Sequence, residues 1–76
     1  MTDDAAERFE LLYRQHRHAV LRYTLARVDP ESAKDATAET FLIAWRRLSD
    51  VPDEPVPWLF AVARKVIAGQ LRSHSR

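Results

Sequence analysis

Hydrophobic residues recur at steps of three and four along three stretches of the chain, a spacing that predicts amphipathic helices. The four prolines separate these stretches, and the only glycine is Gly69. We predict helices over residues 4–28, 30–48 and 57–72, joined across residues 49–57 by a loop whose three prolines exclude helix interior. The expected fold class is therefore all-α, with three helices in a single domain.

The spacing of apolar residues predicts which face of each helix points inward. The first helix has two apolar stripes, so we expect it to contact both other helices. Its stripes hold Phe9, Leu12, Tyr13, His16, Val20, Tyr23 and Thr24, and then Leu21, Leu25 and Val28. The second helix is expected to bury Ala33, Ala36, Thr37, Thr40, Phe41, Ala44, Trp45 and Leu48. The third is expected to bury Leu59, Val62, Ala63, Val66, Ile67 and Leu71.

The start of the second helix has its own signal in the pair Asp29-Pro30. An aspartate at the cap accepts from the free backbone N–H groups of the first turn. A proline at the first helical position has no N–H to lose. We therefore expect Asp29 to cap a helix that begins at Pro30.

Size and composition limit the classes of protein. The chain has 76 residues, 46% hydrophobic and 30% charged, with one glycine and no cysteine. This excludes two domains, a disulfide framework and a cysteine-based zinc site. So small a core needs efficient helix packing or a stabilising partner. No apolar run of 18 residues is present and the first residues are acidic, so we expect a cytoplasmic protein.

The net charge of +1 conceals alternating blocks of charge. Residues 1–12 carry −3, residues 13–28 carry +4 without any acid, residues 29–56 carry −4, and residues 57–76 carry +4. This layout permits a polyanion to bind one face and a protein another, although a run of charge is also typical of a solvated face.

The sequence contains no group of residues that stands out as a candidate for enzyme catalysis. His16 and His18 are two residues apart and point to different sides of a helix, so they cannot share a metal. Asp35 and Glu39 share a helical face, but acid–base catalysis also needs a pocket that three helices hardly provide. One glycine cannot build a phosphate loop. We expect neither an enzyme nor a bound metal or cofactor.

Three motifs in order carry a resemblance to a known family: FELLYRQHR at residues 9–17, DATAETFLIAWR at 35–46 and PWLFAVAR at 57–64. Together they resemble the second conserved region of bacterial RNA polymerase sigma factors, most of all the extracytoplasmic-function group. The resemblance implies a single helical domain over residues 1–76 that docks on the clamp helices of the largest polymerase subunit. It also implies recognition and melting of the minus-ten promoter element.

The resemblance assigns roles to individual residues. It implies that the outer face of the second helix binds polymerase through Asp35, Glu39, Leu42 and Arg46. A leucine among charges suits an anchor inside a polar rim, and a solvated face is the alternative.

For DNA, the resemblance places the loop between the second and third helices against flipped bases of the non-template strand. The polar groups available there are Ser49, Asp50, Asp53 and Glu54. Phosphate contacts would come from Arg64, Lys65 and Arg72. Trp58 either stacks on the end of the melted duplex or anchors the third helix on the core.

The sequence also departs from the family pattern. Lys65 stands where relatives often have asparagine, and Gly69-Gln70 weakens the expected basic patch. A C-terminal region 4-like helix-turn-helix domain is absent after Arg76, so we expect an isolated domain or a naturally shortened protein. An anti-sigma factor is a further expected partner. The rival interpretation is a small helical protein–protein interaction module without DNA binding.

Overall fold

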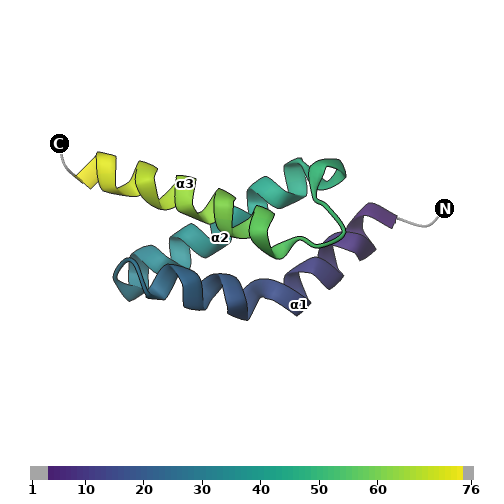
Figure 1. The fold of residues 1–76 in the computed structure, drawn as a ribbon, viewed down its shortest axis with the longest axis horizontal. Helices are drawn as coiled ribbons and strands as arrows, with labels where there is room; N and C mark the ends of the chain where they lie inside the picture. The colour runs from purple at the N-terminus through teal and green to yellow at the C-terminus, as the bar shows by residue number, and fades with distance from the viewer. Residues whose placement is uncertain (1–3, 75–76) are drawn as a thin grey trace.

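The computed structural model describes residues 4–74, which form the three expected helices (Figure 1). They are α1 (Asp4–Leu25), α2 (Pro30–Arg46) and α3 (Val56–His74), with a 3₁₀ turn, η1 (Leu48–Asp50), after α2. No strand occurs within residues 4–74, so the predicted all-α class is confirmed. The ends of the predicted domain, residues 1–3 and 75–76, lie outside the described part.

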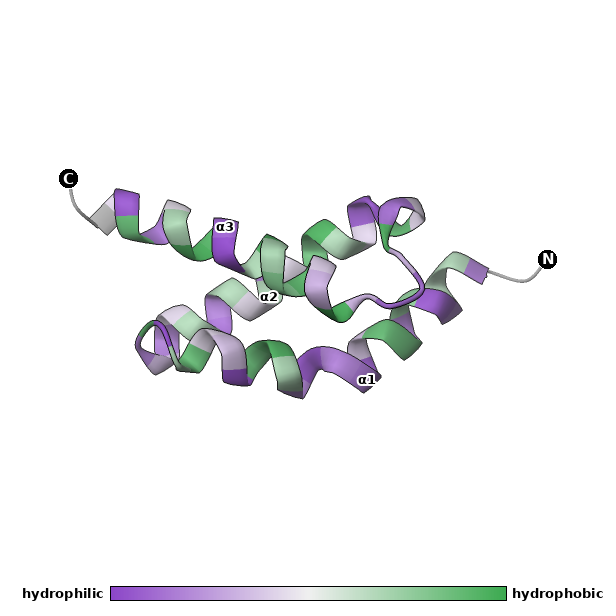
Figure 2. Ribbon diagram, in the orientation of Figure 1, coloured by the Kyte–Doolittle hydropathy of each residue, from purple (hydrophilic) through white to green (hydrophobic). Residues whose placement is uncertain are grey.

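The helices form an elongated bundle of 47 × 21 × 19 Å in which every pair of helices is in contact. Helices α1 and α3 run in the same direction and α2 runs in the opposite direction (Figure 1). Apolar residues lie mainly on the inward sides of the ribbons and polar residues on the outward sides (Figure 2). No helix in the described part is long and apolar enough to cross a membrane.

The core follows the predicted stripes closely. Val20, Leu59 and Ala63 have no exposed surface, and Phe41 has 2%. The small residues Ala33, Ala36 and Ala44 are fully buried in α2, which lets the neighbouring helices approach it. A second group around Ile67 and Val66 continues the core toward the C-terminal half of α3.

Buried hydroxyl groups join α1 to α2. Thr24 is fully buried, and its Oγ1 lies 3.0 Å from Oγ1 of Thr37. The Thr24 hydroxyl also lies 2.9 Å from the carbonyl oxygen of Leu21 and 3.3 Å from that of Ala33. A buried hydroxyl without partners would cost free energy, so this network fixes how the two helices face each other.

The junction between α1 and α2 confirms the predicted cap and corrects the predicted end of the first helix. Asp29 is extended, and its carboxylate accepts from the backbone N–H of Ser32 at 3.2 Å. Hydrogen bonding from Ser32, from its side chain first and its backbone N–H second, lowers the pKa of Asp29 below its ordinary value of 3.8. Helix α1 ends at Leu25, three residues earlier than predicted, because the chain must turn before the extended cap.

The other boundaries shift by one or two residues. Helix α2 ends at Arg46, and Leu48 is buried in η1 instead of in the helix. Helix α3 begins at Val56, inside the predicted loop, and continues to His74. The connection without helix is therefore shorter than predicted, at residues 51–55.

Four apolar residues assigned to the inward stripes are in fact exposed. Trp45 is 45% exposed, because one side of the indole packs on Phe9 of α1 and the other side faces outward. Tyr13 at 39% and Leu25 at 45% lie at the borders of α1's inward face. Leu71 is 55% exposed, since α3 diverges from α1 toward its C-terminal end (Figure 1).

Candidate functional site

The predicted polymerase-binding residues lie together on the outer face of α2. Asp35, Glu39, Leu42 and Arg46 are all exposed, at helical steps of three and four. They border a shallow hollow of about 540 Å³ that also touches Ile43 and Gln70. Leu42 is 46% exposed, so an apolar side chain stands among two acids and one arginine.

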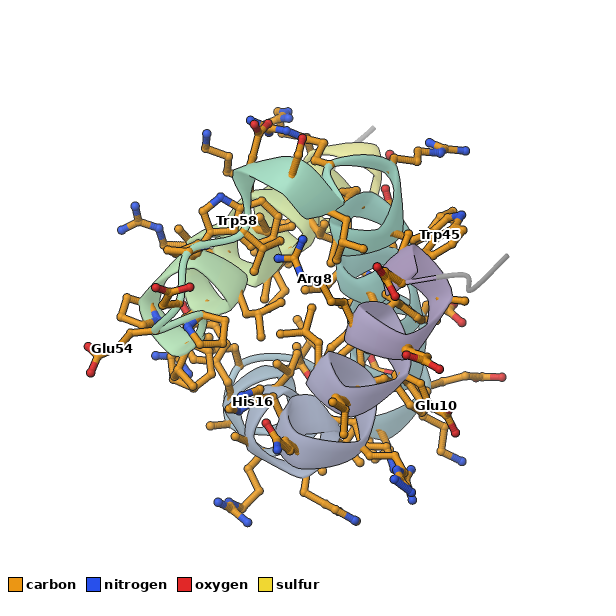
Figure 3. The ribbon with its side chains drawn as sticks, turned by 90° about the vertical axis from the view of Figure 1, so that its right-hand side faces the viewer. Arg8, Glu10, His16, Trp45, Glu54 and Trp58 are labelled. Carbon is orange, nitrogen blue, oxygen red and sulfur yellow. The ribbon has the colours of Figure 1, made fainter. Side chains whose placement is uncertain are left out.

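An apolar groove that the sequence reasoning missed lies beside this face, between α1 and α2. The aromatic groove, as we name it, has a volume of about 550 Å³ and is lined by Ala6, Phe9, Tyr13, Ala38, Phe41, Leu42 and Trp45. Phe9 lies 5.4 Å from Trp45 and 6.4 Å from Phe41, measured between ring centroids and edge to face. Figure 3 shows Trp45 at the outer edge of α2. Leu42 belongs to both hollows, so the two surfaces are continuous.

The signal for this groove was present in the sequence. Phe9 and Tyr13 are four residues apart, as are Phe41 and Trp45. Pairs at this spacing share a helix face, so two aromatic pairs on neighbouring helices indicate one shared cluster. The Tyr13 and Phe41 rings do meet, at 5.1 Å.

The predicted base-reading residues do not converge on one pocket. Ser49 and Asp50 belong to η1, whereas Asp53 and Glu54 lie in the following segment, and all four are exposed. Figure 3 shows Glu54 pointing outward, away from the bundle. The Asp50 carboxylate instead accepts from Nε of Arg47 at 3.1 Å. This ion pair is exposed, so it contributes little to stability but partly neutralises one acid of the loop.

Trp58 lies at the first turn of α3 and contributes both to the core and to an exposed groove. The indole is half-buried and packs against the main core, as the core interpretation expected. Its remaining surface lines a groove of about 660 Å³ between α2 and α3. The Arg47 guanidinium carbon lies 5.9 Å from the centre of the indole, so a cation stands at the mouth of this groove.

The three predicted phosphate-binding residues are exposed and lie within about 100° of one another on the outward side of α3. Lys65 lines the groove between α2 and α3 together with Gly69, whereas Arg64 is one turn beyond Phe60, which packs on α1. Arg72 lies farther along α3, and its side chain is beside Gly69. Its Nη2 would lie 3.8 Å from a Cβ added at Gly69. All three cations are therefore accessible from the outward side of α3.

Within residues 4–74, no group of three or more histidine, cysteine, aspartate or glutamate side chains comes together. His16 is half-buried on α1, whereas His18 is exposed.

Comparisons with known proteins agree with the motifs. The family model for sigma-70 region 2 matches residues 12–76. Three curated relatives are each named ECF RNA polymerase sigma factor SigL, from the Erdman, CDC 1551 and H37Rv strains of Mycobacterium tuberculosis. Each is 38% identical to this chain over 66 residues, which cover 82% of this chain. The match spans 37% of the length of these relatives. No solved structure matches the chain.

Proposed function

Because the chain belongs to the sigma-70 region 2 family, with relatives in the extracytoplasmic-function group, we propose that it docks on the clamp helices of core RNA polymerase and recognises and opens the minus-ten promoter element. In this role the chain is not an enzyme but a specificity component. It supplies contacts to polymerase and to DNA from different faces of one bundle.

The observation that carries the docking proposal is the continuous surface formed by the outer face of α2 and the aromatic groove. Leu42 and Trp45 are exposed apolar side chains at its centre. Asp35, Glu39 and Arg46 supply a charged rim. A buried apolar centre within a polar rim is the usual anatomy of a protein interface, and large aromatic residues are its common anchors. An anti-sigma factor would compete for this same surface.

The DNA proposal is supported by exposed cations on α3 and by the loop beside them. Arg64, Lys65 and Arg72 are available to phosphates, which position a strand without reading its sequence. Residues 49–54 offer hydroxyl and carboxylate groups to extruded bases. Capture of each base offsets the few kcal/mol needed to unstack it, so binding and melting are coupled.

Docking is tested by Leu42→Asp, with Leu11→Asp as the matched control. Leu11 is 52% exposed on α1 and does not line the aromatic groove, so both variants place one carboxylate at a half-exposed leucine. We expect Leu42→Asp to reduce binding to a clamp-helix fragment at least tenfold, because the new charge would be desolvated at the interface. Leu11→Asp should bind as the wild type does.

Circular dichroism establishes that both variants keep their helices. Wild-type affinity of a folded Leu42→Asp variant would remove α2 from the interface. Failure of the folded wild-type chain to bind the fragment would favour the helical interaction module instead.

Promoter opening is tested by replacing Arg64 and Lys65 together with alanine. The control replaces Arg8 of α1 and Lys34 of α2, which removes the same charge from exposed positions elsewhere. Opening is followed with polymerase and a promoter carrying 2-aminopurine in the minus-ten element. We expect the α3 variant to lose opening while the control retains most of it. Equal opening by both variants would contradict the DNA role of these two residues.

A further inference from the structure

A stack of three side chains crosses from α1 to α3 on the side of the bundle away from α2's outer face. The rings of Tyr23 on α1 and Phe60 on α3 lie 4.6 Å apart and nearly parallel, at 28°. The guanidinium carbon of Arg27 lies 3.6 Å from the centre of the Tyr23 ring. We name this arrangement the Arg27 stack, with Phe60 innermost and Arg27 outermost.

Arg27 is held in place more firmly than a surface arginine normally is. Its Nη1 donates to the carbonyl oxygen of Tyr23 at 2.9 Å, and its backbone N–H donates to the carbonyl oxygen of Thr24 at 2.9 Å. The guanidinium therefore has its plane and direction set before any ligand arrives. Less conformational entropy is lost when a pre-ordered side chain binds.

The donors of Arg27 are not consumed by this arrangement. A guanidinium has five N–H donors, and within the described part of the chain one of them is recorded in a hydrogen bond. Arg27 is exposed, so the outer face of the guanidinium is open to a ligand. A planar, fixed guanidinium with free N–H groups suits the oxygens of a phosphate.

The surroundings of the Arg27 stack favour an anion. Residues 13–28 hold four arginines and no acid. Arg64 follows Phe60 by one helical turn, so the stack leads from Arg27 to a residue of the proposed DNA surface on α3. This continuity favours DNA as the anion over an acidic protein.

We propose that Arg27 contacts a backbone phosphate of promoter DNA, so that the DNA surface of α3 continues across the Arg27 stack to the turn that follows α1. The inference rests on the proposed DNA role of α3. It adds a residue in the turn after α1, whose position is set by Tyr23 and Phe60. The purely structural alternative is that Arg27 only satisfies a carbonyl near the end of α1.

The test compares Arg27→Ala with Arg17→Ala. Arg17 is on α1 and also lies over a tyrosine, Tyr13, but at the longer distance of 5.7 Å and beside the aromatic groove. The two variants therefore lose the same charge. Binding to a fork-junction DNA, a duplex with a single-stranded non-template extension, is measured by fluorescence anisotropy across a salt series. The double variant Arg64→Ala, Lys65→Ala is measured in parallel.

We expect Arg27→Ala to weaken binding about three- to tenfold and to reduce the salt slope by about one, as the loss of one phosphate contact predicts. Arg17→Ala should change affinity less than twofold, a long-range charge effect that salt screens. Arg27→Lys keeps the charge but loses the planar guanidinium. Its affinity for the DNA should lie between those of the wild type and Arg27→Ala. In NMR titrations of the wild type, the Nε–Hε signal of Arg27 should move with DNA while that of Arg17 stays.

Two patterns would overturn the inference while leaving the α3 assignment intact. In one, Arg27→Ala behaves like Arg17→Ala although the α3 double variant loses affinity. In the other, the Arg27 signal moves with a polyglutamate peptide but not with DNA, which would assign the stack to an acidic protein. If the α3 double variant also bound DNA as the wild type does, the proposed function itself would be wrong. Thermal unfolding of each variant separates these results from loss of fold.

Discussion

Replacing Trp45 by alanine tests the docking surface where structure and sequence pattern disagree. The indole is 45% exposed and lines the aromatic groove. A tryptophan buries about 150–250 Å² in all, so about 70–110 Å² of Trp45 remains for a partner to cover. At about 25 cal/mol per Å², complete coverage contributes about 2–3 kcal/mol. Trp45→Ala should therefore weaken docking about 20- to 100-fold.

The same substitution also removes a contact within the bundle. Trp45 meets Phe9 edge to face at 5.4 Å, and such aromatic pairs contribute about 0.5–1.5 kcal/mol beyond their buried area. Some loss of stability is therefore expected alongside the loss of docking. Trp45→Phe is the control, because a phenylalanine keeps an aromatic ring beside Phe9 while offering less area to a partner.

Affinity for a clamp-helix fragment is measured by isothermal titration at a temperature where unfolding curves show every variant folded. A second readout uses Trp58→Phe, which leaves Trp45 as the only indole, with a tryptophan-free fragment. Covering Trp45 should shift its fluorescence emission to shorter wavelength. Unchanged emission at saturation, or an affinity of folded Trp45→Ala within twofold of wild type, would refute the reasoning.

Three further predictions concern stability, each measured by unfolding. Thr24→Val should lower the free energy of unfolding by about 1–3 kcal/mol, because it deprives Thr37 of its buried partner. Thr40→Val should lower the free energy of unfolding by less, because the Thr40 hydroxyl bonds only within α2. Gly69→Ala should raise stability by about 0.5–1 kcal/mol, since an added Cβ would meet only Nη2 of Arg72, at an ordinary contact distance of 3.8 Å, and the site has no positive φ; no change or a loss would contradict this. The lowered pKa of Asp29 means that its carboxylate stabilises the fold above pH 3.8 and that this contribution is lost as the pH falls through the folded pKa. Asp29→Asn should therefore be less stable than wild type at pH 7, and the difference should shrink as the pH falls below 3.8.

Local signals in the sequence determined most of the fold. Asp29-Pro30 predicted the start of α2, and the prolines predicted the break before α3, because caps and prolines act through their immediate neighbours. Three alanines of α2, Ala33, Ala36 and Ala44, were predicted as core and are buried. The ends of helices were less predictable, since the end of α1 depends on where the following cap must turn.

Burial at the borders of a stripe could not be predicted from spacing. Trp45 has the same helical phase as core residues, but only the position of α1 decides which side of its indole is covered. The four residues of the outer face of α2 were predicted to share that face, because the spacing within a single helix defines it. The Arg27 stack and the ion pair of Asp50 with Arg47 escaped prediction, because each depends on side-chain positions that the helical period does not specify.

The unequal axes of the bundle, 47 Å long but 21 and 19 Å across, give a footprint that depends on orientation. B-DNA rises about 3.4 Å per base pair, so the bundle lying along the duplex would shield about 14 base pairs, more than one full turn. Lying across the duplex, it would shield about six. A straight bundle cannot follow a groove through a full turn without bending the DNA. A short footprint would therefore indicate that the bundle crosses the duplex. A long footprint would indicate that the duplex is curved.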